Sequence, residues 1–334
     1  MNQIRVALLG FGNVGRAFAE YSRKSGAGVL ARLSIRAVAD SSGGLALNAD
    51  DELDQILAHK AHDRSLAEFS PARIIADPAQ FIASLSASGV SLLVESLPTN
   101  INSGQPALDL IKFALSAGLN VVTVNKGPLV YGFDELRKAA GTGGSRLAYS
   151  GTTGVKIPDE LRGEPVLEIA GILNGTCNYI LTQMQEHGLP FDQALAEAQA
   201  DGIAEPDPLL DIEGWDSAAK LLILAKSLMD ADLAFSDILT RGINADTEGL
   251  INTALTSGKA VRLVGRAREH DGRLRLTVAP EMIAADSPFF PVRGTSKLAV
   301  FKTGTRGIVA SSRSGRDAIS QTIVDDIVRV LPAT

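Results

Sequence analysis

The chain has 334 residues, of which 45% are apolar and 21% are charged, and its formal net charge is −6. This length exceeds what most single hydrophobic cores span, so we expect two domains. The negative charge argues against a general affinity for nucleic acid or anionic membranes. A single cysteine excludes an internal disulfide. No apolar run reaches membrane-helix length and the N-terminus lacks the pattern of a signal peptide, so we expect a cytoplasmic enzyme.

Residues 1–150 alternate short apolar runs with longer helical patterns. Such an alternation is typical of a parallel sheet covered by helices on both faces. It predicts an α/β fold whose N-terminal domain is a doubly wound, Rossmann-like sheet. The expected strands are Ile4–Leu9, Ile35–Ala39, Leu92–Val94 and Val121–Val124, and the expected helices are Val14–Arg23, Pro78–Leu85 and Pro106–Ala117.

The pattern changes after residue 150, where strands and helices mix less regularly. We expect an α+β substrate domain over residues 151–290. Residues 291–334 are set apart as a C-terminal segment, and whether it packs back on the first domain stays open. The Asp271-Gly272 dipeptide predicts a hairpin. The expected elements are Val166–Leu173, Thr176–Gln185, Asp192–Ala200, Ser217–Met229, Val261–Arg268, Leu274–Ala279, Leu298–Lys302, Ile308–Ser311 and an amphipathic final helix through Ile319 and Val330.

A glycine-rich segment, Gly10-Phe11-Gly12-Asn13-Val14-Gly15, joins the first expected strand to the first expected helix. In this context the first glycine permits a tight turn, the second lets the backbone approach a pyrophosphate, and the third lets helix and strand pack closely. The N-terminus of the helix then faces the phosphates. Asp40 ends the second strand, where a carboxylate accepts hydrogen bonds from the adenosine ribose. These features predict NAD or NADP binding, and a glycine-rich turn without a ligand is the alternative.

The residues after Asp40 bear on the choice of cofactor. The segment Ser41-Ser42-Gly43-Gly44 offers no basic side chain for the 2′-phosphate of NADP. This favours NAD. Arg36, or a basic residue remote in sequence, is the alternative that would bind the phosphate.

Two lysines are candidates for catalysis. Lys126 follows an expected strand, and the carboxyl ends of parallel strands face the ligand crevice. Lys220 lies in a helix that is apolar almost all round, where a buried lysine needs a partner or a chemical role. Asp216 lies one helical turn before it, so an ordinary ion pair is the alternative for Lys220. For Lys126 the alternative is a solvated loop lysine.

Several acidic residues precede the expected helix that contains Lys220. Glu205-Pro206-Asp207-Pro208 reads as a stiff acidic loop, and Asp211 and Glu213 follow it. Solvated loop acids and ligands for a cationic substrate are both compatible with this pattern.

In these segments the chain resembles the homoserine dehydrogenase family, in a short form without a regulatory domain. The resemblance implies an NAD(P)-dependent enzyme that interconverts L-aspartate 4-semialdehyde and L-homoserine in the biosynthesis of threonine and methionine. It also implies a homodimer with a small amino acid as substrate. The matching segments are Leu97–Asn100, Val121–Leu129, Gly171–Leu181, Glu197–Gln199, Gly202–Pro208 and Asp211–Lys220.

The resemblance also implies a role for each matched residue. Lys126 and Lys220 would flank the reacting oxygen, polarise the carbonyl and serve proton transfer. Thr99 would lie by the nicotinamide half of the cofactor, as would Lys126. The implied substrate-binding residues are Glu205 and Asp216, which would hold the ammonium, together with Gly175 and Thr176 at the floor of the pocket.

Some positions depart from the family pattern. Ser150 stands where the family carries a glutamate that helps to bind a monovalent cation, and Lys156 lies in the same loop, so we expect no such cation site. Ser287 replaces a histidine. Arg313 and Arg316 stand near a cofactor loop, where contact with the phosphates and exposure to solvent are both open. These departures leave a dehydrogenase for another amino or hydroxy acid as the alternative function.

Other functional classes find less support. Cys177 as an aldehyde dehydrogenase nucleophile lacks a nearby base, so a buried filler is favoured. His59 and His62 have the spacing of a helical metal pair, but charged neighbours indicate a solvated face, so no metal site is predicted. A nucleotide-binding regulator without turnover would have no need of both lysines and both acids.

Overall fold

The computed structural model describes residues 3–24, 28–49, 51–161, 163–312 and 315–331. By its internal contacts the chain forms two compact units. The first unit runs to Thr152 and resumes at Gly315, and the second unit is formed by the residues between them. Among the described residues, no helix combines the length and the apolarity that crossing a membrane requires.

The first unit contains a six-stranded sheet in the order β3-β2-β1-β4-β5-β6. All neighbouring strands are parallel except β2 and β3. This is the order of a doubly wound dinucleotide-binding sheet, so the predicted fold class is confirmed. The sequence analysis missed β3 because it is short and begins with two glycines. The strands are β1 Ile4–Leu9, β2 Leu33–Asp40, β3 Gly43–Ala46, β4 Leu92–Glu95, β5 Asn120–Thr123 and β6 Leu147–Ala148.

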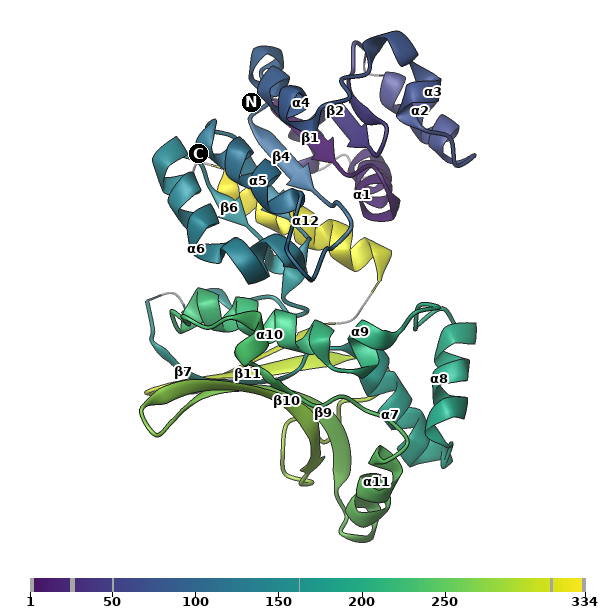
Figure 1. Cartoon of the computed structure of the whole chain (residues 1–334), viewed down its shortest axis with the longest axis vertical. Coiled ribbons are helices and arrows are strands. Elements are labelled where there is room, and N and C mark those ends of the chain that lie inside the picture. Colours follow the sequence, from purple (N-terminus) through teal and green to yellow (C-terminus); the bar gives the residue numbers. More distant parts are fainter. Residues whose placement is uncertain (1–2, 25–27, 50, 162, 313–314, 332–334) are drawn as a thin grey trace. The chain divides into compact units, whose positions relative to one another are not determined.

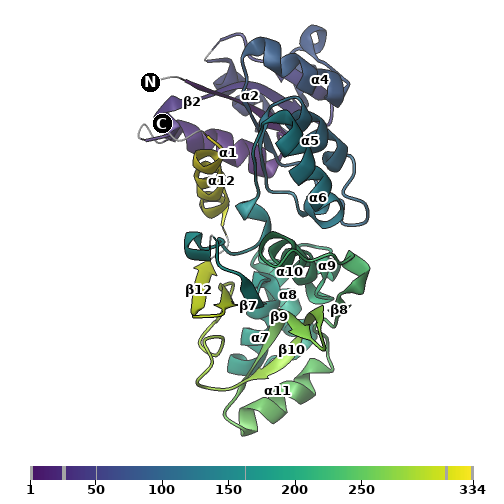
Figure 2. The same cartoon turned by 90° about the vertical axis from the view of Figure 1, so that its left-hand side faces the viewer.

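Helices cover both faces of this sheet. Helices α1 and α12 lie together on one face, and α4, α5 and α6 lie on the other (Figures 1 and 2). Helix α12 comes from the far end of the chain, which the amphipathic pattern alone did not place. The bounds are α1 Asn13–Lys24, α2 Glu52–Lys60, α3 Leu66–Phe69, α4 Pro78–Leu85, α5 Ala107–Ser116, α6 Lys126–Gly143 and α12 Arg316–Val330.

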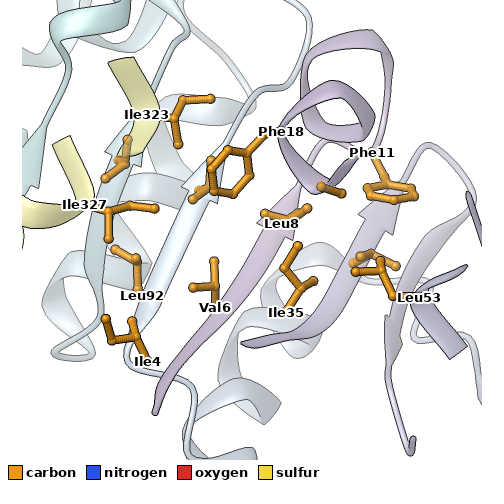
Figure 3. Close-up of a cluster of buried hydrophobic side chains, with 14 of the residues drawn as sticks. Ile4, Val6, Leu8, Phe11, Phe18, Ile35, Leu53, Leu92, Ile323 and Ile327 are labelled. Carbon is orange, nitrogen blue, oxygen red and sulfur yellow. The ribbon is translucent and has the colours of Figure 1, made fainter. Parts of the chain in front are cut away.

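The core beneath α1 and α12 explains why α12 belongs to this unit. Ile4 and Leu8 of β1 point to the same layer because alternate side chains of a strand share a face. Phe18 of α1 and Ile323 and Ile327 of α12 pack against that layer (Figure 3). Each side chain of this size contributes roughly 1.5–3 kcal/mol when it is fully buried. Burial of its apolar stripe therefore holds α12 on the first sheet.

The second unit contains a six-stranded sheet in the order β12-β11-β7-β9-β10-β8. Helices α7 and α10 lie along one of its faces (Figure 1). Asp271 and Gly272 join β9 to β10 with φ angles of 53° and 70°, as the predicted hairpin requires. The bounds are β7 Val166–Ile172, α7 Gly175–His187, α8 Phe191–Ala200, α9 Leu209–Ile212, α10 Trp215–Leu228, β8 Leu239–Thr240, α11 Thr247–Thr256, β9 Ala260–His270, β10 Arg273–Ile283, β11 Lys297–Thr303 and β12 Gly307–Ser312.

The C-terminal segment expected over residues 291–334 divides between the two units. Strand β11 pairs with β7 in the second sheet and β12 pairs with β11. Only the part from Gly315 onward, which includes α12, belongs to the first unit. Backbone hydrogen bonds hold the strands in the second unit, whereas apolar packing holds the helix in the first.

Candidate active site

The glycine-rich segment forms the turn between β1 and α1. Gly10 has a φ of +102°, and a Cβ atom there would lie 2.6 Å from backbone atoms of Ser96. A Cβ atom on Gly15 would lie 2.3 Å from the carbonyl oxygen of Gly10, whereas one on Gly12 would meet nothing within 4 Å. Gly10 and Gly15 are therefore required by the fold, while Gly12 borders open space. This is the room that a pyrophosphate needs beside the backbone.

Hydrogen bonds hold this turn at the start of α1. The backbone N–H groups of Gly10 and Phe11 donate to the Ala39 carbonyl at 3.0 and 2.7 Å. Asn13 is the first residue of α1, and its side-chain oxygen accepts a hydrogen bond of 3.1 Å from Arg16. The first-turn N–H groups of Asn13 and Val14 have no partner within the helix, which makes this terminus suited to a phosphate. The residues present thus fit the phosphates of a dinucleotide.

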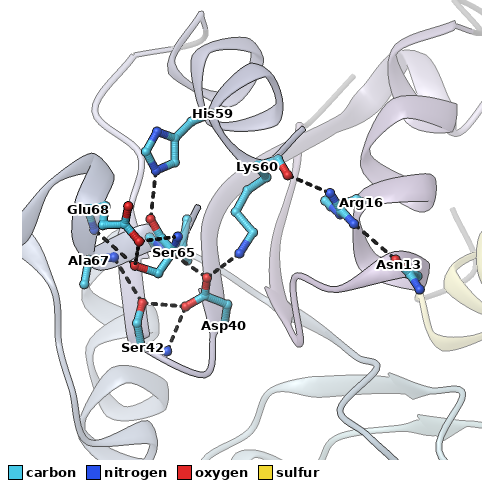
Figure 4. Close-up of polar contacts among 10 residues, drawn as sticks. Asn13, Arg16, Asp40, Ser42, His59, Lys60, Ser65, Ala67 and Glu68 are labelled. Carbon is cyan, nitrogen blue, oxygen red and sulfur yellow. Dashed lines mark hydrogen bonds and ion pairs between the residues drawn. The ribbon is translucent and has the colours of Figure 1, made fainter. Parts of the chain in front are cut away.

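Asp40 at the end of β2 is held by four protein donors (Figure 4). Its Oδ1 accepts from the N–H and the hydroxyl of Ser42, at 2.8 and 2.6 Å. Its Oδ2 accepts from Lys60 Nζ at 2.7 Å and from the Leu66 N–H at 3.0 Å. Burial would raise the pKa of Asp40, but these hydrogen bonds outweigh it and hold the pKa below its ordinary value. A carboxylate has about four acceptor positions. These four bonds therefore occupy the acceptor positions with which Asp40 was expected to bind the ribose hydroxyls.

The segment that follows Asp40 in sequence contains no basic residue, but the fold brings Lys60 next to Asp40. Lys60 ends α2, and its side chain is 14% exposed beside Asp40, which is 8% exposed. Arg16 of α1 donates to the Lys60 carbonyl at 2.8 Å and ties the end of α2 to the glycine turn (Figure 4). The Lys60 charge offsets that of Asp40, so the end of β2 does not repel an added phosphate.

Lys126 and Thr99 follow neighbouring strands of the first unit. Thr99 is exposed in the loop after β4, and Lys126 is half-buried as the first residue of α6 after β5. The side chain of Asn125 caps α6 by accepting from the Gly127 N–H at 3.1 Å. Strands β4 and β5 are parallel neighbours, so both residues lie at the carboxyl edge of the same sheet.

A charged cluster in the second unit surrounds Lys220. Lys220 Nζ donates to Asp216 at 2.5 Å and to the Leu173 carbonyl at 2.9 Å. The Asn174 amide donates to Asp216 at 2.8 Å and to Asp211 at 2.6 Å. The ion pair that was the alternative for Lys220 therefore exists, but it is one part of a larger network. The network joins the end of β7 to α9 and α10.

The acids before Lys220 differ in their surroundings. Asp207 and Glu213 are exposed, as solvated loop acids are, whereas Asp211 is half-buried in α9. Burial and the nearby charge of Asp216 raise the pKa of Asp211, against hydrogen bonding from Asn174. Nothing in the local sequence distinguished Asp211 from its neighbours.

The remaining expected substrate residues lie on α7 and in the loop after α8. Gly175 is the first residue of α7, and Thr176 is buried and donates to the Ile203 carbonyl at 3.2 Å. The side chain of Glu205 is exposed. Within the described ranges, no hydrogen bond or ion pair joins the Glu205 carboxylate to the Lys220 cluster. Asn174, which caps α7 and connects the acids, is the member that the sequence analysis missed.

Comparison with known proteins gives matches over both units of the chain. The family model of the homoserine dehydrogenase NAD-binding domain matches residues 10–150, and the homoserine dehydrogenase model matches residues 156–328. A homoserine dehydrogenase of Methanocaldococcus jannaschii is 32% identical over 98% of this chain and 99% of its own. The chain belongs to the homoserine dehydrogenase family. Its members are oxidoreductases that act on a CH–OH group with NAD or NADP.

Other homoserine dehydrogenases are similar to this chain over nearly its whole length. An NAD(+)-dependent homoserine dehydrogenase of Pseudomonas canavaninivorans is 31% identical and covers 99% of this chain and 97% of its own. The crystal structure of a homoserine dehydrogenase from Thiobacillus denitrificans aligns with a TM-score of 0.80 at 28% identity. That alignment covers 99% of this chain and 73% of the other.

Ser150, where this chain departs from the homoserine dehydrogenase pattern, is bonded to α12. Its N–H and hydroxyl donate to Asp326 at 2.7 and 2.6 Å, and Arg329 donates to its Oγ at 2.8 Å. An arginine at this distance disfavours a cation there. In the part of the chain that the structure describes, no group of three or more His, Cys, Asp or Glu side chains could hold a metal ion. Ser287 caps a turn by accepting from the Phe289 N–H at 3.3 Å.

Arg313 and the side chain of Arg316 lie outside the described residues.

Cys177 and His59, which the sequence analysis weighed as a nucleophile and a metal ligand, make contacts with neighbouring protein groups. Cys177 is buried and donates to the Asp211 carbonyl at 3.0 Å, and burial raises the pKa of its thiol well above the usual range. His59 bonds to the Ser65 carbonyl at 2.9 Å and packs edge-on against Phe69.

Proposed function

We propose that this chain is an NAD(P)-dependent homoserine dehydrogenase that interconverts L-aspartate 4-semialdehyde and L-homoserine. The observation that carries the proposal is the cluster around Lys220, which lies in the segment with the most distinctive family motifs. When bound, the nicotinamide supplies the hydride for reduction of the aldehyde. The protein then has to bind the amino-acid end, polarise the carbonyl and deliver a proton to its oxygen.

Lys220 is suited to the reacting oxygen. An ammonium has three donors, and Asp216 and the Leu173 carbonyl use two of them. Gly154 packs against the lysine stem, because a Cβ atom there would lie 3.2 Å from Lys220 Cδ. The stem and two donors are thus fixed, and the third donor can point at a substrate oxygen. A held cation stabilises the negative charge that develops on this oxygen.

The proposed roles of the other residues follow from their charge and position. Lys126 is a second cation for the reacting oxygen, at the edge of the sheet where the nicotinamide is expected. Asp216 and Glu205 bind the ammonium of the substrate, and Gly175 and Thr176 form the floor of its pocket. Asp211 adds negative charge beside Asp216 and is included with the ammonium site.

Both NAD and NADP are accommodated in this proposal, because Lys60 lies beside Asp40, where the ribose of either cofactor is expected. The acceptor positions of Asp40 are used within the protein, so the carboxylate contributes less to the ribose hydroxyls than its position in the sequence indicated. The Lys60 ammonium beside it can donate to a ribose hydroxyl of NAD or to the 2′-phosphate of NADP. The preference for NAD expected from Ser41–Gly44 is therefore weakened.

The reaction is tested with purified protein, L-homoserine and either NAD or NADP, by absorbance of the reduced nicotinamide near ~340 nm. We expect reduction with homoserine, and the reverse reaction with aspartate 4-semialdehyde. Activity on another amino or hydroxy acid, without activity on homoserine, would replace the proposed substrate. Tight cofactor binding without turnover on any of these would favour the regulator.

We also propose that the enzyme is a homodimer through its second unit, as the family resemblance implies. This unit exposes large apolar side chains on its strands, including Leu167 at 56%, Leu239 at 67% and Val309 at 54%. A homodimer would cover such residues. Light scattering during size exclusion should give twice the 35.0 kDa mass of the chain. The expected cytoplasmic location stays a prediction.

A further inference from the structure

Glu95 is a buried acid at the carboxyl end of β4, on the same side of the first sheet as the start of α6, where Lys126 lies. This acid is the last residue of β4, and its side chain has no exposed surface. Burial raises the pKa of Glu95 to about 6, against hydrogen bonds from Thr123, Asn125 and Leu97. A buried carboxyl group costs free energy that an apolar residue would not. Its presence therefore calls for a role other than packing.

The carboxylate of Glu95 holds the turn between β5 and α6. Its Oε2 accepts from the Thr123 hydroxyl at 2.5 Å, and its Oε1 accepts from the Asn125 amide at 3.1 Å. The Thr123 oxygen in turn accepts from the Asn125 N–H at 3.0 Å. The other end of the Asn125 amide caps α6 at Gly127. Glu95 thus fixes the side chain that sets the first turn of α6, where Lys126 is the first residue.

The same carboxylate holds the loop that leads to Thr99. Glu95 Oε1 accepts from the Leu97 N–H at 2.7 Å, which orients the chain as it leaves β4. Further on, this loop touches α6, because a Cβ atom on Gly127 would lie 2.5 Å from the Asn100 carbonyl oxygen. The hydroxyl of Tyr131 donates to the Ile101 carbonyl at 2.7 Å. The loop after β4 and the first turn of α6 are therefore one connected structure with Glu95 beneath it.

We propose that Glu95 is a positioning residue for Lys126 and Thr99. Its carboxylate collects donors from Leu97, Thr123 and Asn125 and so aligns the two segments that reach the nicotinamide and the reacting oxygen. This inference rests on the proposed function, since it takes Lys126 to be catalytic. Small displacements of such a group reduce turnover strongly, because the reaction depends on its orientation.

Glu95→Leu and Glu95→Gln separate positioning from packing. Leucine removes all three hydrogen bonds, whereas glutamine keeps an oxygen that can accept from Leu97 and Asn125. We expect Glu95→Leu to lower kcat by roughly 10–100-fold while the Kd for the dinucleotide changes less than about threefold, and Glu95→Gln to recover most of the loss. Glu52→Gln is the matched control, since Glu52 is also buried but lies on α2 and pairs with Arg73. Its kcat should equal that of the wild type.

Lys126→Ala distinguishes failure of this inference from failure of the proposed function. An unchanged kcat in Lys126→Ala would remove the assigned role of Lys126. A low kcat in Lys126→Ala with a normal kcat in Glu95→Leu would overturn the inference alone. In the double variant we expect a loss smaller than the product of the two single losses, since Glu95 acts in part through Lys126, and fully additive losses would contradict that. If Glu95→Leu does not fold, Asn125→Ser keeps the helix cap without the bond to Glu95, and a normal kcat there would overturn the inference.

Discussion

The glycine turn of the first unit and the Lys220 cluster of the second unit are built in different ways. Residues 10–15 form the turn within one short segment, and sterics at Gly10 and Gly15 determine its shape. The cluster instead joins Asn174, Asp211 and Lys220 through side-chain hydrogen bonds. A local backbone motif can be read from sequence because its constraints are local. A charged cluster depends on which distant segments the fold brings together.

The largest expected effect is on the cluster. Lys220→Ala removes the ammonium proposed to act on the substrate oxygen, so kcat should fall by about 10²–10⁴-fold. The Kd for the dinucleotide, measured by fluorescence titration, should change little, since the glycine turn belongs to the other unit. Lys226→Ala, in the last turn of the same helix, is the control and should keep its activity. Retained turnover in Lys220→Ala would end its catalytic assignment.

Two alanine substitutions in the glycine turn sharpen the comparison. Gly15→Ala places a Cβ atom 2.3 Å from a carbonyl oxygen and should cost about 1–3 kcal/mol of unfolding free energy. Gly12→Ala meets no atom within 4 Å, so it should fold normally yet weaken dinucleotide binding about 10-fold. Thermal unfolding and cofactor titration measure the two effects. Equal behaviour of both variants would contradict the separate roles assigned to the glycines.

A smaller effect is expected from the lysine beside Asp40. Lys60→Met removes a donor to the 2′-phosphate, a charge-assisted contact of about 1–3 kcal/mol. The ratio of kcat/KM for NADP to that for NAD should therefore fall roughly 10-fold. Lys112→Met serves as the control because Lys112 forms an exposed pair with Glu135. An unchanged ratio would show that Lys60 only braces Asp40.

The last effect concerns the pH dependence of stability. The pKa of folded Glu95 is raised from 4.5 to about 6, so the folded state keeps the proton longer than the unfolded state as pH rises. Stability from this group is therefore present at low pH and is lost between about pH 4.5 and 6. Glu95→Gln cannot ionise, so its stability relative to the wild type should improve by up to about 2 kcal/mol across that window. Urea titrations at pH 4.5 and 7 should show this difference, and parallel curves for both proteins would contradict it.

Much of the fold was predictable because it follows from periodicity and local sterics. The apolar run Ile4–Leu9 matches β1, and the helix predicted over Pro78–Leu85 matches α4. The doubly wound class, the glycine turn and the hairpin at Asp271 also followed from short segments. The antiparallel strand β3 did not, because Gly43–Ala46 carries little of the apolar signal on which strand prediction depends.

The sequence by itself determined the class of the protein, its cofactor turn and the identity of most candidate residues. Only the tertiary structure decided which of these residues have partners. It placed Lys60 against Asp40 and divided residues 291–334 between the units. It also placed Glu95 beneath the turn that carries Lys126. These decisions rest on contacts between segments far apart in the chain, and a hydrogen bond or ion pair leaves no periodic pattern in the sequence.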